Sequence, residues 1–149
     1  MRRIVSITIL ILMLFSLNCS EFMKRMAVKE LQFSLIRVGL IDYNLTDMTL
    51  KVDIRATNPN DIDAVIDKLD YTFFINDKSA ASGTTAKRVK VTAGNKKTFA
   101  TELTVNYIGL GTALFEAVKE KRADYKLEGK VYIETSVGSI TFPVNLLYP

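Results

Sequence analysis

Apolar and polar residues alternate strictly along residues 47–58. The apolar positions are Met48, Leu50, Val52, Ile54 and Ala56. A period of two places these side chains on one face of a β-strand, so the segment is predicted to bury one face and expose the other. Asn58-Pro59-Asn60 follows directly. Because Pro59 lacks a backbone donor and restricts the residue before it, the strand is expected to end there.

The same alternation recurs at short spacing through the rest of the chain, which predicts further strands. In the first, at 32–42, apolar residues occupy both faces, which suggests burial on both sides near its middle. A hairpin turn is predicted at Asn76-Asp77, and Ser82-Gly83 is expected to break the returning strand. The remaining strands are predicted at 65–75, 79–81, Val89 to Val91, 97–107, Tyr125 to Ile133 and Ile140 to Leu146.

One segment has a helical period instead. Leu110, Leu114, Ala117 and Val118 recur at three and four residues, which predicts a helix over 108–121. The basic residues near its end suit the helix dipole. Together these elements predict a mainly β domain over 32–149: a seven-stranded antiparallel β-sandwich of the fibronectin-III or immunoglobulin kind, with one α-helix before the last two strands.

The first 18 residues are expected to be a signal peptide. A basic start at Arg2 and Arg3 precedes an apolar run from Ile4 to Leu17. As a helix this run would span about 21 Å, which is short of the roughly 30 Å hydrocarbon core of a bilayer. A basic segment followed by an apolar segment of that length is typical of a secretory signal.

Cys19 follows this run and is the single cysteine of the chain. Ser16-Leu17-Asn18-Cys19 resembles a bacterial lipoprotein signal, although Leu17 stands one position later than usual and Asn18 replaces a small residue. The resemblance implies lipidation of Cys19, a tether over 19–31 and an exported lipoprotein of the cell envelope. Ser20 favours the outer membrane where two membranes exist. The alternative is an uncleaved signal anchor with an incidental cysteine.

The amino-acid composition argues against several classes of function. The chain has 149 residues, no His and one Cys, so it lacks the commonest general base and metal ligand and cannot form an internal disulfide. Removal of Arg2 and Arg3 with the signal would lower the formal net charge from +4 to about +2. Such a weak and scattered charge argues against nucleic-acid binding. No nucleophile elbow, phosphate loop or metal spacing is present, so neither an enzyme nor a cofactor is expected.

An ordered set of motifs resembles the late-embryogenesis-abundant type 2 family, also called the WHy (water stress and hypersensitive response) domain family. The resemblance covers roughly residues 33–146 and implies a folded fibronectin-III-like sandwich, a link to desiccation stress and no catalytic residues. Its membrane-tethered members suggest lipid binding as a second idea. The motifs are Leu50–Asn60, Leu69–Asp77, Ala81–Gly83, Val91–Asn95, Leu103–Asn106 and Tyr125–Val131.

Several residue groups are candidate sites. The family motif Asn58, Pro59 and Asn60 is interpreted as structural, since a turn at a strand end explains it without a ligand. One hairpin carries cations that could contact anionic headgroups or an acidic partner, or could simply be solvated: Lys87, Arg88, Lys90, Lys96 and Lys97.

Two further groups of residues each have a structural and a ligand-binding interpretation. Asn60, Asp61, Asp63 and Asp67 could bind calcium, but the loop lacks the central Gly and final Glu of an EF-hand and is expected to be solvated. Aromatic residues on the strands could line a lipid cavity, although such rings usually form the core. They are Tyr71, Phe73, Phe74, Phe99, Tyr107 and Phe142.

The leading hypothesis is a non-enzymatic, membrane-anchored protein of this family that protects the cell envelope against desiccation and osmotic stress. The alternative is a module that binds lipid or an envelope protein and has no special link to water. The sequence leaves the oligomeric state open.

Lipidation can be tested directly. Replacing Cys19→Ala should leave unprocessed precursor and abolish labelling by a radioactive fatty acid, because no other thiol can accept a lipid. The test is metabolic labelling followed by electrophoresis. Normal processing of the variant would exclude the lipoprotein interpretation.

Overall fold

The computed structural model describes residues 31–85, 87–106, 110–135 and 138–148. The predicted signal peptide, Cys19 and nearly all of the tether lie outside these residues. The described elements are β1 (Gln32–Tyr43), β2 (Asp47–Thr57), β3 (Ala64–Ile75), β4 (Lys78–Thr85), β5 (Val89–Val91), β6 (Lys96–Asn106), α2 (Thr112–Lys119), β7 (Tyr125–Thr135) and β8 (Gly138–Leu147).

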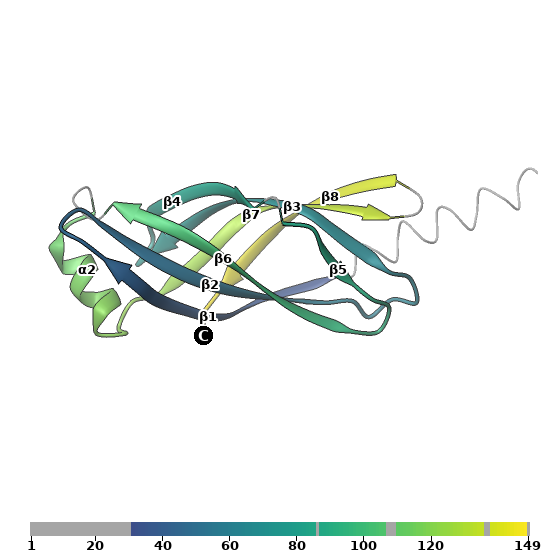
Figure 1. Cartoon of the computed structure of the whole chain (residues 1–149), viewed down its shortest axis with the longest axis horizontal. Coiled ribbons are helices and arrows are strands. Elements are labelled where there is room, and N and C mark those ends of the chain that lie inside the picture. The colour runs from purple at the N-terminus through teal and green to yellow at the C-terminus, as the bar shows by residue number, and fades with distance from the viewer. Residues whose placement is uncertain (1–30, 86, 107–109, 136–137, 149) are drawn as a thin grey trace, which may run out of the picture.

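The strands form two sheets that face each other (Figure 1). One sheet has three strands in the order β1-β2-β6. The other has five, in the order β4-β3-β7-β8, with β5 also paired to β3. Every pair is antiparallel, and the helix α2 precedes the last two strands. The predicted β-sandwich is therefore confirmed.

The described residues contain eight strands, one at each predicted segment, in place of the predicted seven-stranded sandwich. The sequence suggested a break at Ser82-Gly83, yet β4 continues to Thr85 and pairs with β3 throughout. Gly83 lies opposite Tyr71, and a Cβ atom at Gly83 would stand 3.0 Å from the Tyr71 hydroxyl oxygen. Gly83 thus makes room for the Tyr71 ring instead of ending the strand.

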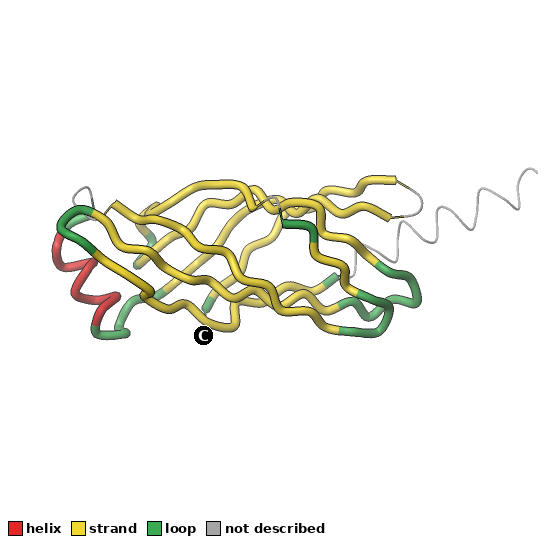
Figure 2. Tube along the Cα trace, in the orientation of Figure 1, coloured by secondary structure: helices red, strands yellow, loops and turns green. Residues whose placement is uncertain are grey.

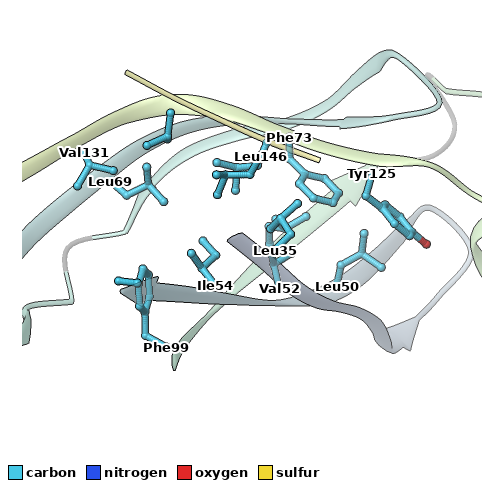
Figure 3. Close-up of a cluster of buried hydrophobic side chains, with 14 of the residues drawn as sticks. Leu35, Leu50, Val52, Ile54, Leu69, Phe73, Phe99, Tyr125, Val131 and Leu146 are labelled. Carbon is cyan, nitrogen blue, oxygen red and sulfur yellow. The ribbon is translucent and has the colours of Figure 1, made fainter. Parts of the chain in front are cut away.

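The alternation in β2 supplies one side of the core. Its five apolar residues, from Met48 to Ala56, are at most 1% exposed. Figure 3 shows Val52 and Ile54 of this sheet facing Leu69 and Phe73 of the other sheet. Tight packing between the two sheets, with most of these side chains fully buried, is the main source of stability.

The first strand differs from the prediction of burial on both faces. In β1 only Leu35 is buried. The pairing with β2 skips Ile36 and then Ile41, so two β-bulges each move the following residues to the opposite face. Apolar residues before and after each bulge therefore point to the same core, opposite Ile54, Val52 and Leu50. The bulges, not two-sided burial, explain the apolar pattern.

The helix α2 is shorter than the predicted 108–121. Its apolar residues Leu114 and Val118 are 7% and 4% exposed, as the helical period predicts. The helix ends at Lys119 because Lys121 adopts a left-handed conformation with φ of 57°. Residues 107–109, where the prediction begins, lie outside the described part of the chain.

The strands run along the long axis, and the connecting segments gather at the two ends of the molecule (Figure 2). We call one end the entry end, because β1 begins there at Gln32. At this end Gln32 pairs with Thr57, and Thr57 pairs with Lys96. We call the other the helix end, where the Tyr43 and Phe115 rings are 5.4 Å apart. A strand of 12 residues such as β1 spans about 40 Å between them.

Gly129→Ala should destabilise the fold. A Cβ atom at Gly129 would lie 2.1 Å from the Asp70 carbonyl oxygen in the neighbouring strand β3, so the sheet must shift. We expect a loss of about 2–3 kcal/mol in the free energy of unfolding, measured by urea denaturation. Gly39→Ala is the matched control. No atom lies within 4 Å of its added Cβ, so stability should change by less than about 1 kcal/mol. Equal midpoints for wild type and Gly129→Ala would refute the steric argument.

Candidate functional site

The Asn58-Pro59-Asn60 motif lies at the entry end, directly after β2. Asn58 is 1% exposed. Its Nδ2 donates to the carbonyl oxygens of Ile62 (2.8 Å) and Val91 (3.1 Å). Its Oδ1 accepts from the backbone N–H and the Nδ2 of Asn60, both at 3.1 Å. Each hydrogen-bonding site of the Asn58 amide is therefore occupied within the protein.

These bonds join two connections that cross between the sheets. Residues 58–63 lead from β2 to β3, and residues 92–95 lead from β5 back to β6. The backbone N–H of Asn58 donates to the Asn95 carbonyl at 2.9 Å, and Gly94 donates to the Asn60 carbonyl at 3.0 Å. The motif thus ties both crossovers together, and its saturated amide leaves no atom of Asn58 for a ligand.

The predicted basic group divides into two parts. Arg88 pairs with Glu134 and with Asp67 (3.6 Å), and Lys90 pairs with Asp63 at 2.7 Å. The hydrogen bond from Lys90, followed by that from the Ala93 N–H, holds the pKa of Asp63 below its ordinary value.

The other three cations, Lys87, Lys96 and Lys97, are exposed. None of them forms an ion pair within the described ranges. These three lysines are available to an anionic surface, whereas Arg88 and Lys90 are engaged in the protein's own ion pairs.

The acidic residues of the same loop do not converge. Asp63 forms an ion pair with Lys90, and Asp67 forms one with Arg88. The Asn60 side-chain amide donates a hydrogen bond to Asn58. Across the residues that the structure describes, no group of three or more acidic, His or Cys side chains is arranged to hold a metal ion. The geometry gives these residues a structural role in the loop.

Within the described part of the chain, the aromatic residues of this set lie on different faces of the sheets. Phe73 and Phe99 are packed in the core at 0% and 8% exposure, and the Phe33 and Phe142 rings are 5.9 Å apart. Phe74 lies on the other face of β3, where the Lys126 Nζ stands 4.6 Å from its ring. Tyr107 lies outside the described residues, as does Cys19. No described helix has the length and apolar character to cross a membrane.

Sequence reasoning missed a cleft at the helix end, between β1 and the segment that follows α2. It has a volume of about 510 Å³. Lys119 and Lys121, which the sequence assigned only to the helix dipole, lie on its rim. Their spacing gave no signal, because β1 and α2 are far apart in the sequence. The full lining is Arg37, Val38, Gly39, Leu40, Val118, Lys119, Lys121, Ala123, Tyr125 and Tyr148.

Comparison with protein families gives one match that spans most of the sandwich. The model of the family described as late embryogenesis abundant protein (LEA_2) matches residues 53–146. No curated protein matches the sequence.

Solved structures share the fold at low sequence identity. A solution structure of an Arabidopsis thaliana protein has a TM-score of 0.57 at 19% identity, covering 76% of this chain and 76% of that one. A protein described as a late embryogenesis abundant (LEA) protein has a TM-score of 0.55 at 17% identity, covering 79% and 68%. An Archaeoglobus fulgidus protein has a TM-score of 0.52 at 15% identity, covering 76% and 94%. These confirm the architecture.

Asn58→Ala should destabilise the protein by about 2–4 kcal/mol, because it leaves the carbonyls of Ile62 and Val91 without their donor. Chemical denaturation measures the loss. Asn95→Ala is the matched control: Asn95 is exposed and its amide bonds only to Ala93, so the change should be about 0.5 kcal/mol or less. A similar loss in both variants would contradict the special role of Asn58.

Asn58→Asp adds a pH test. The introduced carboxylate faces two carbonyl oxygens in place of a donor, so burial and repulsion should raise its pKa above the value in the unfolded chain. The folded variant then binds the proton more tightly, and its deficit relative to wild type should be largest at neutral pH and shrink as the pH falls through the raised pKa. A deficit independent of pH would show that the carboxylate is not buried at this place.

Proposed function

The chain belongs to the late embryogenesis abundant protein family (LEA_2), and on that premise we propose that it is a non-enzymatic, membrane-anchored protein that protects the cell envelope during desiccation and osmotic stress. The proposal combines the family with the signal-like N-terminus and the predicted lipidation of Cys19. Multiple acyl chains on one cysteine would hold the domain stably on a membrane.

The observation that carries the proposal is the direction in which the chain enters the domain. β1 starts at Gln32, in the same row as Thr57 and Lys96. A tether attached upstream of Gln32 would therefore direct the entry end towards the bilayer. The exposed lysines Lys96 and Lys97, which pair with Thr57 and Ala56 at this end, would meet anionic headgroups.

A rigid domain held this way acts as a hydrated spacer. The tied crossovers fix the entry end, and the outer faces of the sheets carry charged and polar side chains such as Lys51, Arg55 and Lys130. The strands would hold a neighbouring surface about 40 Å from the bilayer. As water is lost, such a spacer would oppose close contact and fusion between membranes.

The proposal includes no catalytic role. The chain has no His, and the described part shows no arrangement of ligands for a metal. The Asn58 side chain in the Asn58-Pro59-Asn60 motif forms its hydrogen bonds within the domain. A broad hydrolase screen on the purified protein should therefore give no turnover above background.

The decisive experiment is survival of a deletion strain after controlled drying and rehydration. We expect survival to fall several-fold and to recover with the wild-type gene, but not with Cys19→Ala, which removes the predicted anchor. Complementation with Lys87→Gln, Lys96→Gln and Lys97→Gln together should restore survival only in part. Survival that is unchanged by the deletion would refute the protective role.

A further inference from the structure

The cleft at the helix end is a separate feature from the entry end. Val38 and Leu40 of β1 form one wall, and Lys119 and Lys121 lie on the other side at the end of α2. The volume of about 510 Å³ falls within the range of small-molecule sites, which is roughly 300–1,000 Å³. Of the residues in the family motifs only Tyr125 lines it, and none of the residues that the proposed function uses does.

The lining combines an apolar floor with a rim of one charge sign. Val38, Leu40, Val118 and Ala123 supply hydrocarbon surface, and Val118 is only 4% exposed. The three charged residues of the lining are all cationic, and none is acidic. Cationic side chains beside apolar surface complement a molecule with one anionic and one apolar part.

The two lysines are the cations available to such a molecule. Arg37 is already paired with Asp53: its Nε donates to Oδ2 at 2.8 Å, and its Nη2 lies 2.6 Å from the same oxygen. Asp53 is 7% exposed, so this pair is fixed within the sheet. Lys119 and Lys121 are exposed and form no ion pair with any residue in the described ranges. The Lys119 Nζ lies 6.0 Å and 5.9 Å from the ring centres of Tyr43 and Phe115, which are weak contacts that an anion could replace.

Lys121 occupies a position that a side chain normally avoids. After α2, the Lys121 N–H donates to the Val118 carbonyl at 3.1 Å and the Arg122 N–H to the Ala117 carbonyl at 2.8 Å. This is the Schellman pattern, in which glycine is favoured at the left-handed position. Lys121 holds φ of 57° there at a cost in backbone strain. The sequence thus has a lysine, not a glycine, at this position in the lining of the cleft.

Two phenol rings complete the floor. Tyr125 and Tyr148 line the cleft with their rings 5.9 Å apart in an edge-to-face arrangement. The Tyr125 ring extends from the edge of the core cluster, with its hydroxyl group at the periphery (Figure 3). Burial raises the pKa of Tyr125 above its ordinary value.

We propose that this cleft binds a single-chain amphiphilic anion, with its carboxylate or phosphate between Lys119 and Lys121 and its apolar chain along Val38, Leu40 and Ala123. The site lies at the end opposite the entry end, so it would stay open to solvent in a tethered molecule. Its occupation does not depend on the protective role, and either can fail without the other.

The test uses the chain from Cys19 to Pro149 with Cys19→Ser, which contains every residue of the core cluster from Leu31 to Leu146. Dodecanoate and dodecyl phosphate are titrated by calorimetry below their micelle concentrations. Dodecyltrimethylammonium, with the same chain and the opposite charge, is the control ligand. We expect saturable binding of at least one anion at one site, and none of the cation. The tighter of the two anions identifies the headgroup class.

Substitutions at the cleft test whether the anion binds there. Lys119→Gln with Lys121→Gln should weaken anion binding about tenfold or more. The matched control, Lys96→Gln with Lys97→Gln, removes the same charge at the entry end and should bind as wild type. Lys121→Gly should weaken binding while the Tm stays at or above that of wild type, because glycine relieves the left-handed strain. Equal binding of the cation, or full binding by the Lys119/Lys121 double variant, would overturn the proposal.

Discussion

The Asn58 amide is the interaction on which the rest of the structure depends. It stands where the chain leaves the three-stranded sheet and bonds to the carbonyl of Val91 in β5, which belongs to the other sheet. The crossovers from β2 to β3 and from β5 to β6 are thereby fixed at one end of the molecule. A buried amide with all its partners present is stable, and it would be costly with any partner missing. The need to satisfy the buried Asn58 amide explains why Asn58-Pro59-Asn60, which has no reactive group, determines the structure of the entry end.

From this constraint follows a molecule with two distinct ends. The entry end is closed by hydrogen bonds and by the ion pairs of Arg88 and Lys90, with exposed lysines around it. The helix end is more open: α2 covers it only in part and leaves the cleft beside β1. A tethered molecule would therefore present a rigid, hydrated base to its own membrane and a pocket to the space beyond. Protection and ligand binding would occupy different surfaces of one fold.

The sequence predicted those features that local periodicity determines. The alternation in β2 marks its buried face, and Asn76-Asp77 takes the positive φ values of a hairpin turn. The features that the sequence did not predict depend on contacts between residues far apart in the chain. The bulges in β1 depend on pairing with β2, and the continuity of β4 past Gly83 depends on the Tyr71 ring of β3. The partners of the Asn58 side chain, up to 33 residues away, and the cleft between β1 and α2 also arise only after the chain has folded.

The most direct test of the account is an orientation experiment on vesicles. The single thiol of Cys19 can be coupled to a maleimide lipid, which reproduces the predicted anchor at the entry end. A variant with Cys19→Ser and Leu45→Cys is anchored instead at the helix end, where Leu45 is 93% exposed. Retention of a trapped dye is then measured after drying and rehydration. The account predicts high retention with the Cys19 anchor and less with the reversed anchor. Leakage equal to that of bare vesicles with the Cys19 anchor would contradict it.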